Sequence, residues 1–524
     1  MWRRRAAEEA LAINVTAARA LQELLKSSLG PRGTVKMLVS EAGEVRMTKS
    51  GGVLLREMRL QHPIASLVAQ AAVTMGDTAG DGVISVVLLV GEMLRRAEIL
   101  VSEGVHPRLI VEGLEAAKEE AISCLDELWE DQEDSIMWKV ARTSLGTKLC
   151  PMLAEGLTQL VVEAVMAISH RREPVDLRLV GLVEMSQGME LDTTLVKGLV
   201  LEHGARHPGM RRRVEDAFIL GLNMALELER PRDNASCFHK GVEDRESFTK
   251  VERRTAQERV DKILALKREV CGPSGKGFVV VNQKGIDPLA LEALAREGVV
   301  ALRRTKRSDM ERLPLACGGQ TVSSVVELTT EILGQAGLVH QQTMGESTYT
   351  FIEGCHNPRS VTVVIRGPNQ HVTGQLREAV RCGMLAVKNT FEDGCAMPGA
   401  GAVEIRIGNW LANHAQPKVK GAARLGFRAF ADAILVIPKT LAQNAGYHPQ
   451  ETVGKALEAE ERTTLPVGID LSTGGLVEGW ETPVWDNATV KHQLIHTSTA
   501  IVRNILLVDN IVTTGTTKSP KSHI

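Results

Sequence analysis

Aromatic residues are scarce in this sequence, where they make up only 3% of 524 residues. The hydrophobic cores must therefore be built from Val, Leu, Ile, Ala and Met, which suits long helices. The scarcity also argues against a platform of aromatic rings on which nucleic-acid bases would stack. No uninterrupted run of about 18 apolar residues occurs, so we expect no transmembrane helix.

The chain also lacks paired cysteines and a strong charge of either sign. Its eight cysteines are scattered without a CxxC pair, so we expect free thiols and no zinc site. The net charge is −2, which predicts neither nucleic-acid nor anionic-membrane binding. The strongest basic cluster is Arg303–Arg307. We interpret it as a solvated face, with a nucleic-acid patch as the alternative.

The order of the expected elements predicts about two to four domains, one of them interrupted by an insertion. Residues 6–141 are mostly helical, residues 175–365 mix strands with helices, and residues 370–510 return to helix. We expect helices at 6–28, 64–73, 83–94, 107–128, 152–168, 288–295 and 370–392. We expect strands at 45–49, 177–180, 195–201, 278–281, 299–302 and 361–365, short strands within 466–486, and a polar junction at Thr143–Lys148.

Gly80-Asp81-Gly82 separates two apolar helix-like runs. The glycines let the backbone approach a ligand closely, and the N-terminus of the second helix offers N–H groups and a positive dipole end to phosphate. Asp81 could then hold a Mg²⁺ that bridges phosphates. A plain turn between helices with a solvated Asp81 is the alternative, and the tripeptide alone favours it.

Other turns rich in small residues are spread along the chain. They are Leu29–Gly33, Thr48–Gly52 and Met397–Glu404, whereas Gly272–Gly277 lacks the Walker spacing and is interpreted as a simple turn. Together with the long segments 277–288 (GFVVVNQKGIDP) and 430–439 (FADAILVIPK), these motifs resemble the group II chaperonins, the family of the TCP-1 ring complex. The resemblance runs from about residue 10 to residue 509.

The resemblance implies a multidomain fold with all-α and α/β parts. Residues 1–141 and 398–524 would form a helical equatorial domain that binds nucleotide, and residues 142–207 and 363–397 a hinge-like intermediate domain. Residues 208–362 would form an inserted α/β apical domain that binds substrate proteins. A helical protrusion is expected at about residues 236–270, with an ordinary surface helix as the alternative.

The resemblance also implies ATP and Mg²⁺ as cofactors, with Asp81 as the metal ligand. The residues expected around ATP are Gly30, Gly82, Val83, Ile84, Ser85, Thr147, Lys148, Gly399, Ala400, Gly401, Gly468 and Asp486. Gly468 and Asp486 would close the end that holds the base and the ribose.

Several positions depart from the family pattern. Ser50 and Cys382 stand where the family has aspartates, and Val83 and Ile84 replace two threonines. Losing a general acid or base typically costs about 10²–10⁴ in rate, and a thiol with a pKa near about 8.5 is mostly neutral at pH 7. We therefore assign no catalytic residue and expect ATP binding with impaired hydrolysis. Arg406 and Asn409 also fall where small or apolar residues are expected, and a buried unpaired arginine would be costly.

By resemblance, the chain would be a subunit of a cytoplasmic, hetero-oligomeric double ring. It would bind ATP and assist the folding of unfolded proteins, cytoskeletal proteins among them, with no nucleic-acid or membrane partner. The basic cluster at 303–307 would then be part of the client-facing surface. The alternative is a diverged copy that does not hydrolyse ATP and binds proteins outside the ring.

Overall fold

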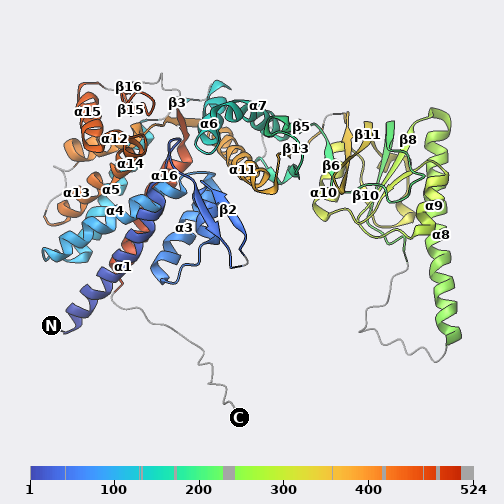
Figure 1. Cartoon of the computed structure of the whole chain (residues 1–524), viewed down its shortest axis with the longest axis horizontal. Helices are drawn as coiled ribbons and strands as arrows, with labels where there is room; N and C mark the ends of the chain where they lie inside the picture. Colours follow the sequence, from blue (N-terminus) through green and yellow to red (C-terminus); the bar gives the residue numbers. More distant parts are fainter. Residues whose placement is uncertain are drawn as a thin grey trace, which may run out of the picture. The chain divides into compact units, whose positions relative to one another are not determined.

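The structure is a computed structural model that divides into two compact units, each described by itself (Figure 1). The first unit comprises Met1–Thr158 and Glu378–Ile524, and the second comprises Gln159–Arg377. One unit is thus built from two distant halves of the chain, as the order of elements predicted. The three-domain division remains a prediction. The residues described are 2–41, 43–128, 130–131, 134–169, 174–227, 242–356, 358–415, 421–463, 465–478 and 484–508.

The first unit is mostly helical. Its helices are α1 (Trp2–Lys26), α2 (Gly51–Glu57), α3 (Pro63–Ala79), α4 (Val83–Ser102), α5 (Pro107–Asp126), α6 (Asp134–Gly146), the start of α7 (Pro151–Ile168), most of α11 (Gln370–Asp393), α12 (Ala402–Trp410), the π-helical η5 (Leu411–Ala415), α13 (Ala423–Ile434), α14 (Val436–Asn444), α15 (Pro449–Arg462) and α16 (Ala488–Leu506). Proline starts α3 and α5 at the first helical position, where its missing N–H is not needed.

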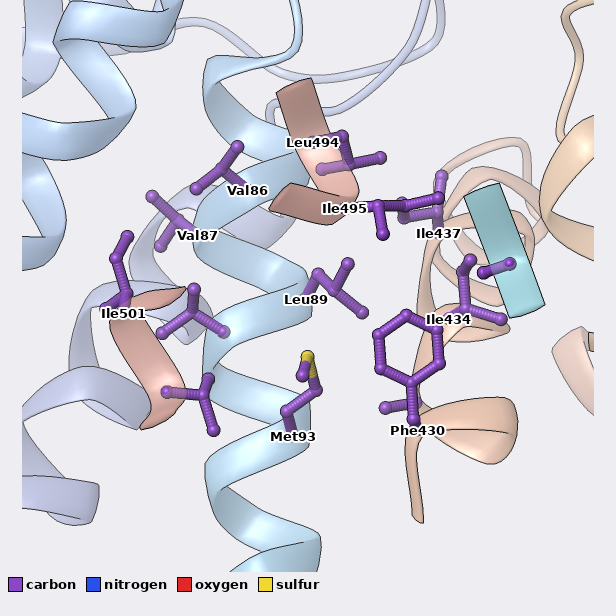
Figure 2. Close-up of a cluster of buried hydrophobic side chains, with 14 of the residues drawn as sticks. Val86, Val87, Leu89, Met93, Phe430, Ile434, Ile437, Leu494, Ile495 and Ile501 are labelled. Atoms are coloured by element: carbon purple, nitrogen blue, oxygen red, sulfur yellow. The ribbon is translucent and has the colours of Figure 1, made fainter. Parts of the chain in front are cut away.

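Helix α4 lies at the centre of this unit, packed against α1, α3, α13 and α16. Every residue from Val86 to Leu94 is buried, and most of them are apolar. The exception in charge is Glu92, which is paired with Arg95 and Arg96. Figure 2 shows Val86, Val87, Leu89 and Met93 of α4 within a cluster of buried side chains that come partly from the C-terminal half of the chain. Phe430, Ile434, Ile437, Leu494, Ile495 and Ile501 are among them. Burying one such side chain stabilises the folded state by about 1.5–3 kcal/mol. Because the buried side chains come from both halves of the chain, this hydrophobic core holds the two halves together.

Short strands complete the first unit. A hairpin pairs β1 (Lys36–Val39) with β2 (Val45–Thr48), and β15 (Val467–Ile469) pairs with β16 (Leu476–Glu478). A three-stranded sheet has the order β17 (Trp485–Asn487), β14 (Cys395–Pro398), β3 (Glu130–Asp131). This sheet places residue 486 beside residue 397.

The second unit is α/β. Its main sheet has the order β6 (Leu199–Leu201), β12 (Ser347–Glu353), β11 (Gly334–Met344), β7 (Arg213–Leu222), β8 (Gly277–Asn282), β9 (Val300–Leu302), with β10 (Thr321–Val322) also on β7. A smaller sheet has the order β4 (Val180–Met185), β13 (Val361–Arg366), β5 (Thr194–Val196). The other elements are helices α8 (Val242–Ser274), α9 (Pro288–Arg296) and α10 (Arg307–Cys317), and 3₁₀ turns η1 (Leu177–Leu179), η2 (Glu190–Asp192), η3 (Val325–Glu327) and η4 (Thr330–Ile332). The predicted strand–helix–strand unit is confirmed, since β8 and β9 are parallel with α9 between them in sequence.

Three local predictions were wrong. Residues 177–179 form a 3₁₀ turn, because the Asp176 side chain accepts a hydrogen bond from the Arg178 N–H, and the strand begins only at Val180. The turn expected at 272–277 is shorter than predicted, since α8 runs to Ser274 and β8 begins at Gly277. The polar junction at 143–148 largely belongs to α6, which ends at Gly146. Residues 236–241 of the expected protrusion lie outside the described residues, and the rest falls in α8.

The basic cluster at 303–307 is largely paired with acidic side chains. Arg304 lies 3.8 Å from Glu227, and Arg307 lies 2.9 Å from Glu311. Lys306 forms an ion pair with Glu202. Little unpaired charge is left there for a nucleic-acid phosphate.

Among the described residues, one helix is long and apolar enough to cross a membrane on length and composition alone. It is α7, and 56% of it is buried inside the protein. A core helix of a soluble protein passes the same test, so this is weak evidence for a membrane span.

Candidate functional site

A cavity of about 760 Å³ opens in the first unit and has the size of a typical small-molecule site. Segments scattered from residue 28 to residue 494 line it. They include the turn after α1, the start of α2, the α3–α4 turn, the end of α6, one face of α11, the β14–α12 turn and the start of α16. The fold therefore gathers segments that are far apart in the sequence.

Most of the residues predicted around ATP line this cavity. They are Gly30, Asp81, Gly82, Val83, Ile84, Ser85, Thr147, Lys148, Ala400, Gly401 and Asp486, joined by the altered positions Ser50 and Cys382. Gly399 and Gly468 lie directly behind the lining. A Cβ on Gly399 would be 3.3 Å from the Asp486 carboxyl carbon, and one on Gly468 would be 3.3 Å from the Ala400 Cβ. Their individual roles stay predictions.

The α3–α4 turn presents the N-terminus of α4 to the cavity. Gly80 and Gly82 have φ angles of 82° and 83°, a conformation that glycine adopts without strain. The first internal bond of α4 runs from the Val86 N–H to the Gly82 carbonyl. The N–H groups of residues 83–85 therefore precede the helical ladder and suit an anion.

Two lysines and one carboxylate face one another near this turn. The Lys148 Nζ lies 3.6 Å from an Asp81 oxygen. Burial opposes the positive charge of Lys148, but the nearby acidic groups, Asp81 first, outweigh it and raise its pKa. Burial, followed by repulsion from Lys148, lowers the pKa of Lys49 to about 8, and its Nζ donates a 2.9 Å hydrogen bond to the Pro31 carbonyl. With two lysines and one carboxylate, this part of the cavity favours an anionic ligand.

Cys382 lies on α11 behind the turn, and its residue is only 8% exposed. Burial raises the pKa of its thiol, an effect that the charge of Lys148 only partly offsets. The thiol is therefore neutral at pH 7 and is a poor base for a water molecule.

Val83 and Ile84 form an apolar wall beside the helix N-terminus. A Cβ on Gly76 would lie 2.4 Å from a Val83 methyl, and one on Gly51 would lie 2.7 Å from Ile84 Cγ1. The neighbouring Ser50 is the N-cap residue of α2, and its side chain makes no capping hydrogen bond. No hydroxyl or carboxylate from residues 83 and 84 reaches this part of the cavity.

The cavity lining also includes a buried cation that sequence reasoning missed. The Lys491 Nζ lies 2.7 Å from Asp486 and 2.7 Å from Glu404. Burial lowers its pKa, but the two carboxylates outweigh this and the net pKa is raised. Lys491 thus fixes Asp486, which pairing with β14 also holds in place. The sequence around Lys491 gave no sign of this role, because nothing near it in the sequence distinguishes it from a lysine on the surface of a helix.

These groups fit Mg²⁺ with a nucleotide. The α4 N-terminus, Lys49 and Lys148 can hold phosphates, and the Asp81 carboxylate can hold Mg²⁺. Among the described residues, no cluster of three or more His, Cys, Asp or Glu is placed to bind a metal. Asp81 would therefore share the ion with phosphate oxygens, which is how Mg²⁺ is usually bound. The bound ion would neutralise part of the negative charge of the phosphates.

Sequence similarity identifies the class of protein. The chain belongs to the TCP-1/cpn60 chaperonin family, whose pattern matches residues 21–516, and it has the multidomain group II chaperonin fold.

Among individual relatives, the chain is 51% identical over 511 residues to T-complex protein 1 subunit zeta-2 of Homo sapiens, covering 97% of this chain and 96% of that protein. It is 50% identical over 510 residues to the Mus musculus protein of the same name, with the same coverage. The motifs quoted from the sequence also predict a zeta-like subunit, and the similarity to these two proteins confirms this.

Proposed function

We propose that this protein is a zeta-like subunit of a cytosolic chaperonin ring that binds Mg²⁺–ATP and assists the folding of unfolded proteins. Its own ATP hydrolysis is impaired. One observation carries the proposal: a single cavity collects the glycine turns, Asp81, Lys148 and Asp486 from segments far apart in the chain. Other ring subunits and unfolded client proteins are the proposed partners.

The cavity lining combines groups suited to phosphate with a group suited to a sugar. The α4 N-terminus and two lysines favour phosphates. Asp486, held by Lys491, offers a fixed carboxylate acceptor for sugar hydroxyls. A simple phosphate would not need this acceptor, so the arrangement favours a nucleotide.

The same cavity supports slow hydrolysis. The positions that the family resemblance assigns to water activation hold Ser50 and a buried neutral thiol at Cys382. Val83 and Ile84 place methyl groups against glycines where hydroxyls would otherwise be available. The binding groups remain, and the groups for proton transfer are missing.

An exposed apolar hairpin face supports assembly with partners. Met37 pairs with Met47 and Val39 with Val45 across the β1–β2 hairpin, and all four side chains are between 40% and 65% exposed. Contiguous exposed apolar side chains on a small sheet mark an interaction surface. If the protein is a ring subunit, as proposed, a neighbouring subunit of the ring would bind this face.

Calorimetric titration with ATP tests nucleotide binding. We expect wild type to bind ATP more tightly with Mg²⁺ than without it, and Asp81→Ala to lose this Mg²⁺-dependent gain. Glu103→Ala, at the exposed opposite end of α4, is the matched control and should bind as wild type does. If wild type and Asp81→Ala bind equally with and without Mg²⁺, the metal assignment is wrong. If wild type binds no ATP, nucleotide binding itself is refuted.

A further inference from the structure

Two cysteines of the second unit lie in contact, and neither lines the nucleotide cavity. The sulfur atoms of Cys317 and Cys355 are 3.5 Å apart, and both thiols are free. Cys317 is buried in a hydrophobic core cluster, and the partly buried Cys355 packs against the same cluster. Neither residue belongs to the proposed nucleotide site.

Each cysteine lies next to a glycine at the end of an element. Cys317 is the last residue of α10, and the following Gly318 has a φ of 77°. Cys355 follows the end of β12, after Gly354 with a φ of 67°. A hydrogen bond from the Arg359 N–H to the Leu315 carbonyl already joins the two segments at 2.9 Å. A covalent bond between the sulfurs would therefore join segments that are already held together.

We propose that Cys317 and Cys355 form a modification site: a dithiol that a hydroperoxide converts reversibly into a disulfide linking α10 to the segment after β12. This site does not depend on the proposed nucleotide function. The sulfurs need to approach by about 1.5 Å to reach the S–S bond length of about 2.05 Å.

The surroundings assign a role to each thiol. A hydrogen bond from the Cys317 thiol lowers the pKa of Cys355, and burial and the charge of Glu353 only partly oppose it. Donating that hydrogen bond, together with burial, raises the pKa of Cys317. The thiolate is the nucleophile in such oxidations, and it must also meet the oxidant. Cys355 is the more exposed and more acidic thiol, so it reacts first.

The reaction is balanced with one hydroperoxide. The Cys355 thiolate attacks a peroxide oxygen, the O–O bond breaks, and the leaving hydroxide takes a proton to become water. Cys355 is thereby oxidised to a sulfenic acid. The Cys317 sulfur then attacks the Cys355 sulfur, the S–O bond breaks, and a second water leaves. Two thiols and one hydrogen peroxide give one disulfide and two waters, and an added dithiol reverses the oxidation.

The test uses the full chain treated with graded hydrogen peroxide, blocked with iodoacetamide and digested without reduction. No Lys or Arg occurs between residues 313 and 358, so trypsin leaves both cysteines in the single peptide 313–359. We expect this peptide to lose two hydrogen atoms and to escape alkylation. A second cleavage after glutamate, for example at Glu327 or Glu346, should leave two fragments joined until dithiothreitol is added.

Variants separate the proposed pair from general oxidation. In Cys317→Ser, dimedone should trap a sulfenic acid at Cys355, whereas Cys355→Ser should give little trapping at Cys317. Cys150→Ser removes an exposed thiol elsewhere and should leave the cross-link unchanged. The oxidised wild type should also unfold roughly a few degrees higher than the reduced protein, a shift absent from Cys355→Ser.

Three outcomes would overturn the proposal. Both thiols could be alkylated fully at peroxide levels that already oxidise Cys150. Cys355 could be found paired only with Cys150 or other partners. The two cysteines could go directly to sulfinic acids in wild type without a cross-linked intermediate.

Discussion

The residues around Asp81 combine retained binding groups with altered catalytic positions. Lys148, Asp81 and the α4 N-terminus are together in one cavity. Cys382 is beside them, but burial raises its pKa and keeps it neutral. The neighbouring Val83 and Ile84 offer only methyl groups. A single side chain therefore does not account for the expected loss of hydrolysis.

We predict that the purified subunit releases phosphate from ATP far more slowly than its family norm. Cys382→Asp alone should recover only part of the activity, because Ser50, Val83 and Ile84 still lack the expected groups. Residues that act as one unit are strongly non-additive. The combined variant, with Ser50→Asp, Cys382→Asp, Val83→Thr and Ile84→Thr, should gain more than the product of the separate gains.

The measurement is steady-state phosphate release, with Cys382→Ala as the control. This variant should match wild type. Family-like turnover in the unmodified chain would contradict the prediction. Loss of residual activity in Cys382→Ala would also contradict it, since the thiol itself would then be functional.

At the element scale, the arginine that looked costly in the sequence has a partner. The Arg406 Nη1 on α12 lies 2.7 Å from Glu460 on α15, whose side chain is fully buried. Glu460 also accepts a 3.1 Å hydrogen bond from the Val467 N–H, which ties α15 to the start of β15. Asn409 forms a hydrogen bond with Asn413 near the end of α12. The expectation that Arg406 would be unpaired and therefore destabilising was wrong.

We predict that Arg406→Met lowers the free energy of unfolding by about 3–5 kcal/mol, because Glu460 is left buried without its partner. Replacing both residues, as Arg406→Met with Glu460→Met, should recover much of this loss. Urea denaturation followed by circular dichroism measures both effects. Arg428→Met, at an exposed position on α13, should change the free energy by less than about 0.5 kcal/mol. Equal stabilities of wild type and Arg406→Met would show that the pair contributes nothing.

For the whole molecule, the question is whether the subunit enters a ring or acts alone as a diverged binding protein. The apolar face of the β1–β2 hairpin favours a partner. The altered hydrolytic positions are compatible with either case, because neighbouring subunits could supply hydrolysis.

We predict that the full chain, mixed with the other ring subunits, elutes with them as a large species in size-exclusion chromatography and is captured with them by pull-down. Replacing Met37, Val39, Val45 and Met47 by serine or threonine should remove it from that species, since the exposed face would lose its apolar contacts. Val326→Ser, a single exposed apolar site in the second unit, is the control and should not change elution. A wild-type chain near monomer mass under these conditions would favour the free binding protein.

The sequence by itself determined the class of the protein and much of its organisation. Helical periodicity and glycine-rich turns are local features, so they predicted most elements and the two-part first unit. They also pointed to the Asp81 turn as part of a cavity. The errors at 177–180 and 272–277 were local as well, since a side-chain cap and a helix extension changed where elements begin and end.

Only the tertiary structure decided which distant side chains meet. Arg406 and Glu460 are 54 residues apart, Lys491 and Glu404 are 87 apart, and Cys317 and Cys355 are 38 apart. No spacing rule links such positions, because the path of the intervening chain sets their distance. The same packing buries Cys382 and pairs Lys148 with Asp81, and so fixes the charge of each group in the cavity. Charge and reactivity depend on burial and on neighbours in space, which a linear sequence does not specify.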